Sequence, residues 1–145
     1  MPSFSGSYTG RVQTQSISIV PDVDDHALAI AIIPTKQKSS DPLWEGAQMT
    51  YCATSDTIAG KGTQRGYFVN EHPNGDRDYG TFEGKVTTTD NGAASVEGSW
   101  QLTGGTGMFT RIKGNGAFKA RMTSPVDVEG SWTGSYDLSA GNLPA

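Results

Sequence analysis

The chain has 145 residues with a formal net charge of −4, and 34% of its residues are hydrophobic. That length suits one domain with its own core. Its 19 glycines exclude a helical bundle, because glycine in a helix interior costs roughly 1 kcal/mol. The negative charge excludes non-specific nucleic-acid binding, which depends on clustered Lys and Arg.

The few cysteines and histidines and the lack of long apolar runs exclude intramolecular disulfide bonds, several kinds of metal site and membrane-spanning helices. One cysteine, Cys52, can form neither an intramolecular disulfide nor a multi-cysteine zinc site, and two histidines leave little for any other metal site. No run approaches the ~20 apolar residues of a membrane-spanning helix, and residues 1–10 lack the features of a signal peptide. We therefore expect a cytoplasmic protein with no metal, no cofactor and no nucleic-acid or membrane partner.

Apolar and polar residues alternate along most of the chain, which is the period-two pattern of strands with one buried face. In chain order, this pattern predicts strands near 4–20, 26–38, 43–58, 61–71, 78–89, 93–103, 108–122 and 127–138. Almost nothing helical separates them, and closing a single antiparallel sheet would remove its exposed edges. The predicted fold is all-β: a single eight-stranded antiparallel up-and-down β-barrel over residues 1–145, with a C-terminal tail at 138–145.

The connections between these strands favour hairpins. Asn74-Gly75 and Asn91-Gly92 supply the positive φ angles that tight hairpin turns need, and Gly60 marks another turn. The stretches from Val20 and from Thr35 contain prolines and predict longer loops at the rim of the barrel.

The segment 108–122 shows which face of the sheet is buried. Its odd positions carry Arg and Lys, whereas its even positions are Met108, Ile112, Gly114, Gly116, Phe118 and Ala120. The same alternation in the repeat VEGSW, found at Val96 and Val128, sends Glu97 and Glu129 outward. We predict that these glutamates pair with the cationic stripe on the neighbouring strand, worth a few tenths to about 1 kcal/mol per pair.

Within this repeat, the glycine and the tryptophan point inward. Each inward glycine removes a side chain from the lumen, and Trp100 and Trp132 bound the space that remains. Burying one tryptophan removes about 150–250 Å² from water. The pattern therefore predicts an aromatic lumen with room left by the glycines.

Two of the predicted strands have an ambiguous register. Counting from Trp44, Gln48, Thr50 and Cys52 point inward, whereas a slip of one residue turns Met49, Tyr51 and Ala53 inward instead. The segment 61–71 offers the same choice, between Gln64, Gly66, Phe68 and Asn70 on one face and Arg65, Tyr67 and Val69 on the other. Both alternatives stay open at the level of sequence.

A motif near residue 104 resembles a known family. Gly104-Gly105-Thr106-Gly107, followed by Phe109, is similar to the glycine signature of allene oxide cyclase and dirigent barrels, a calycin-like group. The upstream stretch DRDYGTFEGKV, from Asp76, resembles the strand before that signature in allene oxide cyclases. The resemblance spans about residues 76–122. It implies an eight-stranded barrel that acts on a small molecule in its lumen without a cofactor, and a homo-oligomer, either a dimer or a trimer.

The candidate site is the barrel lumen. Its candidate catalytic residues are Tyr8 and Tyr136 as acids or hydrogen-bond donors, Cys52, whose distance from the glycine motif is similar to that of the family's cysteine, and His26 as a base at the rim. The candidate substrate-binding residues form aromatic walls with a few polar groups: Trp44, Gln48, Tyr67, Phe82, Trp100, Phe118 and Trp132.

Such a pocket suits a hydrophobic or phenolic small molecule. The function that we expect is a cofactor-independent isomerase, cyclase or lyase that enforces the shape of its substrate and donates hydrogen bonds to it. The alternative is a non-catalytic, lipocalin-like binding protein. Titratable groups in an open lumen would favour the first function, and an apolar lumen the second.

Overall fold

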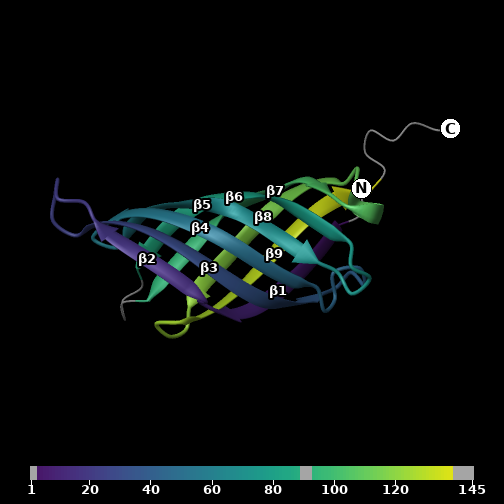
Figure 1. The fold of residues 1–145 in the computed structure, drawn as a ribbon, viewed down its shortest axis with the longest axis horizontal. Coiled ribbons are helices and arrows are strands. Elements are labelled where there is room, and N and C mark those ends of the chain that lie inside the picture. The colour runs from purple at the N-terminus through teal and green to yellow at the C-terminus, as the bar shows by residue number, and fades with distance from the viewer. Residues whose placement is uncertain (1–2, 89–92, 139–145) are drawn as a thin grey trace.

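Nine strands follow one another along the described part of the chain, and eight of them close into a barrel (Figure 1). The computed structural model describes residues 3–88 and 93–138. The strands are β1 (Ser3–Arg11), β2 (Thr14–Ile19), β3 (His26–Ser39), β4 (Gln48–Ile58), β5 (Lys61–Glu71), β6 (Arg77–Thr88), β7 (Ala94–Gly105), β8 (Lys113–Met122) and β9 (Asp127–Asp137).

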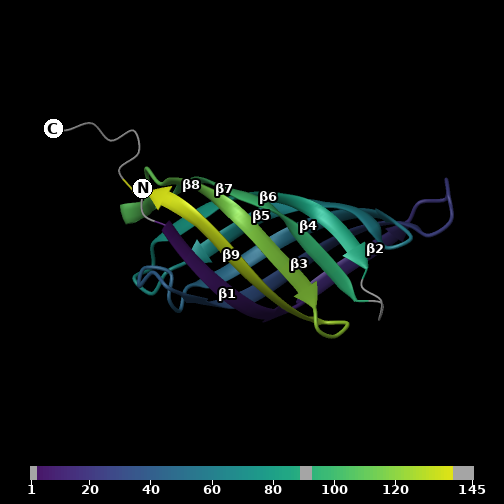
Figure 2. The same ribbon diagram turned by 180° about the vertical axis from the view of Figure 1, so that it is seen from behind.

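All the strand pairings are antiparallel. The sheet order is β1-β9-β8-β7-β6-β5-β4-β3-β2, and pairing of β1 with β3 closes the ring (Figure 2). Because β1 and β2 together fill the first predicted strand, the eight-stranded antiparallel barrel expected from the sequence is confirmed. The predicted turn at Asn91-Gly92 and the tail beyond Leu138 lie outside the described residues.

The first predicted strand is interrupted by a bulge at Val12 and Gln13. β1 pairs with β3 as far as Gly10 opposite Thr35, and β2 resumes with Thr14 opposite Ile32, a register shift of one residue. A bulge of this kind reverses which side chains point inward and increases the local twist. β1 therefore stays beside β9, whereas β2 pairs with β3 alone.

Two other predicted strands are shorter than expected. Residues 40–47 form turns rather than the start of a strand, and the left-handed backbone of Gly46, with φ of 76°, ends the alternation that starts from Trp44. The segment 108–122 begins as the short 3₁₀-helix η1 (Gly107–Phe109), so Met108 is exposed instead of buried. The turn at Gly46 shifts the parity of the residues that follow it, whereas η1 displaces Met108 alone and Ile112, Phe118 and Ala120 still point inward.

The glycine motif at 104–107 forms a tight turn at the end of β7, as the sequence suggested. Gly107 has φ of 57°, and its Cα lies so close to the Asp76 carboxylate that a side chain would collide with it. The Met108 N–H donates to Asp76 Oδ2 at 3.3 Å. Glycine is required here because the backbone is left-handed and the carboxylate leaves no room for a Cβ.

The glutamates of the VEGSW repeat point outward and form cross-strand ion pairs. Lys119 Nζ lies 3.9 Å from Glu97 Oε1, and Arg121 Nε donates to Glu129 Oε1 at 2.6 Å. The prediction of their direction is therefore confirmed. The glycines do not leave a hollow, however, because a Cβ at Gly130 would overlap the ring of Tyr8. The space beside this glycine is filled by an aromatic ring from the neighbouring strand.

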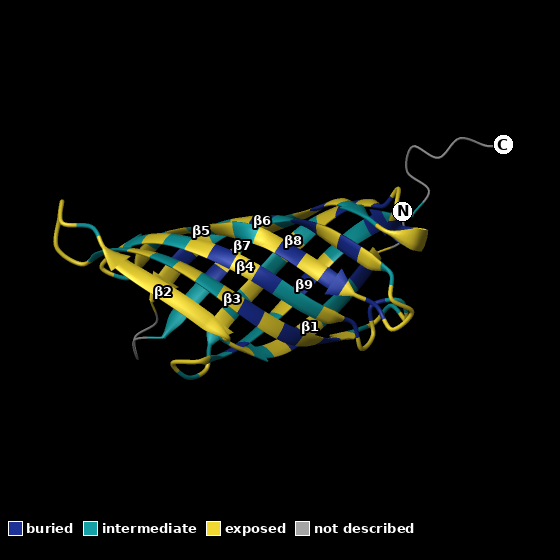
Figure 3. Cartoon of the chain, in the orientation of Figure 1, coloured by how far each residue is buried: buried dark blue, intermediate teal, exposed yellow. Residues whose placement is uncertain are grey.

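The two ends of the barrel differ in how much they bury (Figure 3). The end where β1 begins and β9 ends is covered by residues 40–47, by the turn after β5 and by η1. The opposite end holds the β2–β3 turn and the β8–β9 turn. We call these the closed end and the open end. The helical content of the described residues is the three-residue η1, and no helix among them is long enough to cross a membrane.

Candidate functional site

Aromatic rings pack the closed end of the lumen. The loop 40–47 folds Trp44 inward until only 2% of it remains exposed. The Phe4 ring lies 4.7 Å from that of Trp44, 4.6 Å from that of Trp132 and 4.6 Å from that of Tyr136, measured between ring centroids. These tilted and edge-to-face contacts are the favoured geometry for aromatic pairs. The closed end is therefore a packed core.

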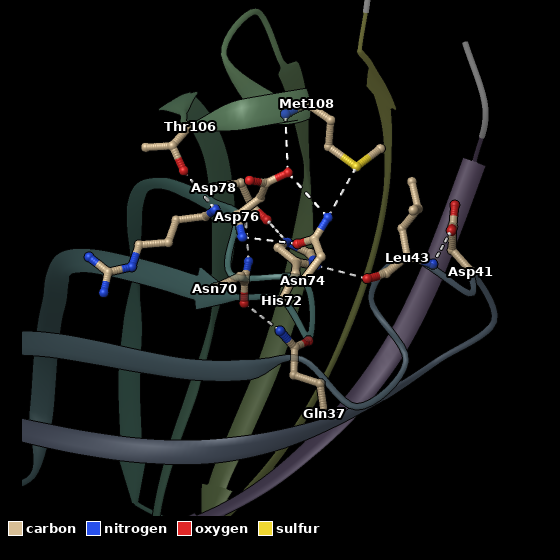
Figure 4. A network of polar contacts seen from close by, with 11 residues as sticks. Gln37, Asp41, Leu43, Asn70, His72, Asn74, Asp76, Asp78, Thr106 and Met108 are labelled. Carbon is tan, nitrogen blue, oxygen red and sulfur yellow. Dashed lines mark hydrogen bonds and ion pairs between the residues drawn. The ribbon is translucent and has the colours of Figure 1, made fainter.

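A chain of buried polar side chains runs through this aromatic core (Figure 4). Asn70 Nδ2 donates to Asp78 Oδ1 at 2.8 Å, and Gln37 Nε2 donates to Asn70 Oδ1. The indole N–H of Trp132 completes the chain by donating to Gln37 Oε1 at 2.8 Å. No polar side-chain atom that is fully buried in the described residues lacks a partner, so the network satisfies its own members.

His72 and Asp78 anchor the network at the closed end. The Nδ1 of His72 lies 2.8 Å from the carbonyl oxygen of Leu43, which can only accept, so Nδ1 carries a hydrogen. Its Nε2 lies 2.5 Å from Asp78 Oδ2, and Asp78 is fully buried. Burial favours the neutral ring, but the hydrogen bonds to Asp78 and to Leu43 outweigh it and raise the pKa of His72 above its ordinary value. We assign an imidazolium paired with a buried carboxylate.

The lumen widens toward the open end. The space outside the atoms, including the part that is open to solvent, is about 630 Å³ at the inner aromatic pocket and about 2330 Å³ at the mouth. Small side chains make this difference, because the mouth is lined largely by residues such as Ala29, Ala31, Ala53, Ser55 and Ala94. A small molecule therefore finds its room in the mouth, against the aromatic wall.

Two tyrosines stand where the inner pocket meets the mouth. Tyr8 and Tyr51 both line the inner pocket, and Tyr51 also lines the mouth. Their ring centroids are 6.1 Å apart. Neither hydroxyl has a hydrogen-bond partner among the described residues, and neither is a sealed, unsatisfied atom. Both hydroxyls therefore reach open space in the lumen, where a ligand or water would be their partner.

These two tyrosines stay protonated at ordinary pH. Burial raises the pKa of Tyr8 well above its usual value. Burial also raises the pKa of Tyr51, and the neighbouring Tyr8 adds to this rise. Burial disfavours the charged phenolate, so each hydroxyl serves as a hydrogen-bond donor and not as a base.

The structure brings six of the residues predicted from the sequence to the inner pocket. They are the candidate acid Tyr8 and the candidate substrate-binding residues Trp44, Phe82, Trp100, Phe118 and Trp132. Tyr136 is buried at the closed end, where its hydroxyl donates to Asp41 Oδ2 at 2.5 Å. Burial, with the bond to Asp41, raises the pKa of Tyr136 to about 12. Its hydroxyl is thus already occupied.

Three predicted lumen residues lie on the outer surface instead. Cys52 and Gln48 are exposed on β4, and Tyr67 is 68% exposed on β5. Of the two registers that the sequence left open, β4 therefore turns Met49, Tyr51 and Ala53 inward, and β5 turns Gln64, Phe68 and Asn70 inward. The prediction that Cys52, Gln48 and Tyr67 line the pocket is wrong, because the turn at Gly46 resets the alternation of β4, and Tyr67 lies directly opposite Cys52 in the ladder and shares its outward face.

His26 lies outside the lumen, at the tip of the open end. Its Nδ1 lies 2.6 Å from Asp22 Oδ1 and its Nε2 lies 2.6 Å from Asp56 Oδ1. Both hydrogen bonds raise the pKa of His26. The His26 ring therefore links the β2–β3 turn to β4 through hydrogen bonds to two carboxylates. The structure does not place it against a substrate in the lumen.

Sequence reasoning missed the polar network and Tyr51 as a lumen donor. The sequence did contain evidence for one part of the polar network, because the hairpin centred on Asn74 places Asn70 opposite Asp78. In the same way, Gln37 shares the inward parity of Ile33 in β3. Nothing local links His72 to Leu43, because the two lie on different loops.

Comparison with known proteins supports the fold. No protein-family model matches the chain, and no curated protein matches it. Among solved structures, the chain is similar to a pterocarpan synthase dirigent protein, with 14% sequence identity and a TM-score of 0.51. The match covers 100% of this chain and 91% of that one. This likeness supports the dirigent part of the resemblance at the level of the barrel.

Proposed function

We propose that this barrel binds an apolar or phenolic small molecule in its mouth and directs a cofactor-independent isomerisation, cyclisation or elimination of that molecule. The observation that carries the proposal is the pair of hydroxyls on the buried residues Tyr8 and Tyr51, which have no partner among the described residues and reach the open space of the lumen. A few polar groups that converge on an apolar wall are what fixes the orientation of a ligand in a small-molecule pocket.

The shape of the lumen supports the same substrate class. A ring system that enters the mouth meets the aromatic wall of the inner pocket, with Phe82 and Phe118 packed edge to face at 5.7 Å. The small side chains of the mouth leave the space, and the rings limit how deep the molecule enters. Apolar walls with a few convergent polar groups are typical of small-molecule sites.

The chemistry follows from the two hydroxyls. A carbonyl or phenolic oxygen of the substrate, at the boundary between the inner pocket and the mouth, would accept hydrogen bonds from Tyr8 and Tyr51. When ring closure or elimination places negative charge on that oxygen, these bonds strengthen and lower the barrier. The walls hold the substrate in one reactive conformation, which removes the entropy cost of finding it. The dirigent protein of similar fold is named a pterocarpan synthase, which is consistent with control of a phenolic substrate.

One observation favours a second candidate, a binding protein without catalysis. The inner pocket is lined by Gln, Asn and Tyr as its polar residues, with no carboxylate, imidazole or amine among the described residues. General base catalysis would therefore need a group supplied by the substrate or by water. A carrier needs only the aromatic wall and the two donors.

Native mass spectrometry and ligand-induced thermal shift separate these functions. We expect the purified chain to retain or bind aromatic molecules that carry a ketone or phenol oxygen. The double variant Tyr8→Phe/Tyr51→Phe should bind them at least about tenfold more weakly, because two hydrogen bonds are lost. The matched control is Tyr67→Phe, which removes an exposed hydroxyl on the outer face.

The outcome decides between the candidates. If the bound molecule is converted and Tyr51→Phe lowers kcat more than it raises KM, the catalytic proposal stands. If binding is retained with no conversion, the carrier is the function. Binding that is equal in the double variant and in Tyr67→Phe would place the ligand elsewhere and overturn both.

A further inference from the structure

β2 has a free edge. In the described barrel it pairs with β3 on one side, while β9 pairs with β1 as far as Arg11 opposite Asp127, and the Val12 N–H donates to the Val126 carbonyl just before β2 begins. The bulge at Val12 and Gln13 carries β2 beyond the end of β9, so the ring closes without it (Figure 1). One edge of β2, at the open end of the barrel, therefore has no partner strand.

The backbone groups on this edge follow from the ladder. The Val20 N–H donates to the His26 carbonyl at 2.9 Å, so even positions of β2 bond to β3. In an antiparallel ladder, the alternate residues direct their N–H and C=O groups the other way. Gln15, Ile17 and Ile19 therefore present theirs to the free edge.

Nothing in β2 guards this edge. Natural edge strands are protected by charged residues, proline or bulges within them, but Thr14–Ile19 reads TQSISI, without charge or proline. All six residues are exposed, with Ile17 at 58% and Ile19 at 71%. An uncharged strand with exposed isoleucines is a template for another strand.

We propose that β2 pairs in antiparallel fashion with β2 of a second copy, about a two-fold axis through Ile17. In that register, Ile17 faces Ile17 of the second copy and Gln15 faces Ile19, so every free backbone group of the edge is used. The pairing makes about six backbone hydrogen bonds. It is self-complementary, as a two-fold interface must be.

Charge complementarity supports a second copy of the chain as the partner of β2. The antiparallel arrangement sets the end of β2 that leads into the acidic turn, with Asp24 and Asp25, beside the end of the other copy's β2 that follows Arg11. Arg11 is exposed, as is the Asp127 carboxylate that it pairs with in its own chain. Opposite charges at the two ends of the strand favour the antiparallel over the parallel arrangement.

The small size of the β2–β2 contact predicts a weak dimer. One strand of six residues on each side forms an interface at the small end of the range for specific complexes. We therefore expect a dimer in concentration-dependent equilibrium with the monomer, with Kd of about micromolar or weaker.

Sedimentation velocity across a concentration series tests the proposal. We expect the mass to rise from that of one 15.3 kDa chain toward twice that value. Ile17→Lys should weaken the association at least about tenfold by placing a charge at the centre of the edge. The matched control is Val69→Lys, which places the same charge on the outer face of β5, away from β2. It should leave the equilibrium unchanged.

A second pair of variants tests backbone pairing directly. Gln15→Pro removes one N–H from the free edge without touching a bond to β3, and Gln15→Ala removes the side chain alone. We expect the first to dissociate the dimer and the second to retain it, with near-UV circular dichroism showing that both are folded. A chain that is monomeric at every concentration, or a dimer that Val69→Lys breaks and Ile17→Lys does not, would overturn the proposal.

Discussion

The two ends of the barrel use the same strands to opposite effect. At the closed end, Trp44, Phe4 and Trp132 fill the lumen, and the network from His72 to Gln37 pairs its own buried polar groups with one another. At the open end, alanines and serines line a wide mouth. The difference shows that one barrel can hold its shape with one half and keep space with the other. Side-chain size along each strand decides which.

The Tyr8 and Tyr51 pair marks the border between the two halves. On one side, buried hydrogen-bonding groups have partners within the protein, as Tyr136 has in Asp41. On the other side, the hydroxyls of Tyr8 and Tyr51 face open space. The contrast predicts that stability is concentrated at the closed end and binding at the border.

The largest effect should come from Trp132→Ala. This change removes a buried ring from the Phe4 contact and the donor to Gln37, and we expect a loss of about 3–5 kcal/mol in the free energy of unfolding. In contrast, Thr57→Ala in the mouth should change it by less than about 0.5 kcal/mol. Urea denaturation measures both. Equal losses of unfolding free energy in the two variants would contradict the prediction that stability is concentrated at the closed end.

Asp78→Ala should follow, with a loss of about 3 kcal/mol, because it leaves the buried ring of His72 without its counter-charge. The matched control is Asp56→Ala, which removes an exposed carboxylate from the half-buried ring of His26, where Asp22 remains as a second partner. Its loss in the same urea titration should be much smaller, since water replaces the lost partner. A control variant as unstable as Asp78→Ala would show that burial is not the deciding factor.

The pH dependence of stability sharpens the comparison further. The pKa of His72 is raised in the folded state, so its contribution is fully present below its unfolded pKa of about 6.5 and is lost as pH rises through the folded value. The pKa of His26 is raised as well and acts in the same direction. Stability should therefore fall as pH rises from about 6.5 through the raised folded pKa values.

An NMR titration of the two imidazoles resolves their contributions. Both should titrate above 6.5, and His72→Gln should reduce the pH slope of stability measured by urea denaturation. A slope that is unchanged in this variant would contradict the assignment of an imidazolium at the closed end.

The smallest effects separate bonded from unbonded hydroxyls. Tyr136→Phe breaks the bond to Asp41 and should cost about 1 kcal/mol, whereas Tyr51→Phe removes an unpartnered hydroxyl and should cost less than about 0.5 kcal/mol. Thermal or urea unfolding of the two variants provides the comparison. A larger loss for Tyr51→Phe would mean that its hydroxyl has a partner in the folded protein.

Period-two alternation predicted much of this barrel because a strand's side chains alternate strictly between its faces. It located the strands and the outward direction of Glu97 and Glu129, and it placed Tyr8, Trp100 and Trp132 inside. It failed where a turn reset the count. Gly46 separates Trp44 from β4, so the inward residue is Tyr51 and not Cys52.

The sequence by itself therefore determined the all-β class, the hairpin order and an aromatic lumen, because these depend on local alternation and turn residues. Tertiary structure decided the rest. It joined Trp132 on β9 to Gln37 on β3, and His72 to the Leu43 carbonyl, across long stretches of chain. It also left one edge of β2 without a partner strand, because a bulge of one residue carries β2 past the end of β9. Contacts between distant segments depend on how the sheet closes, and local patterns do not encode that closure.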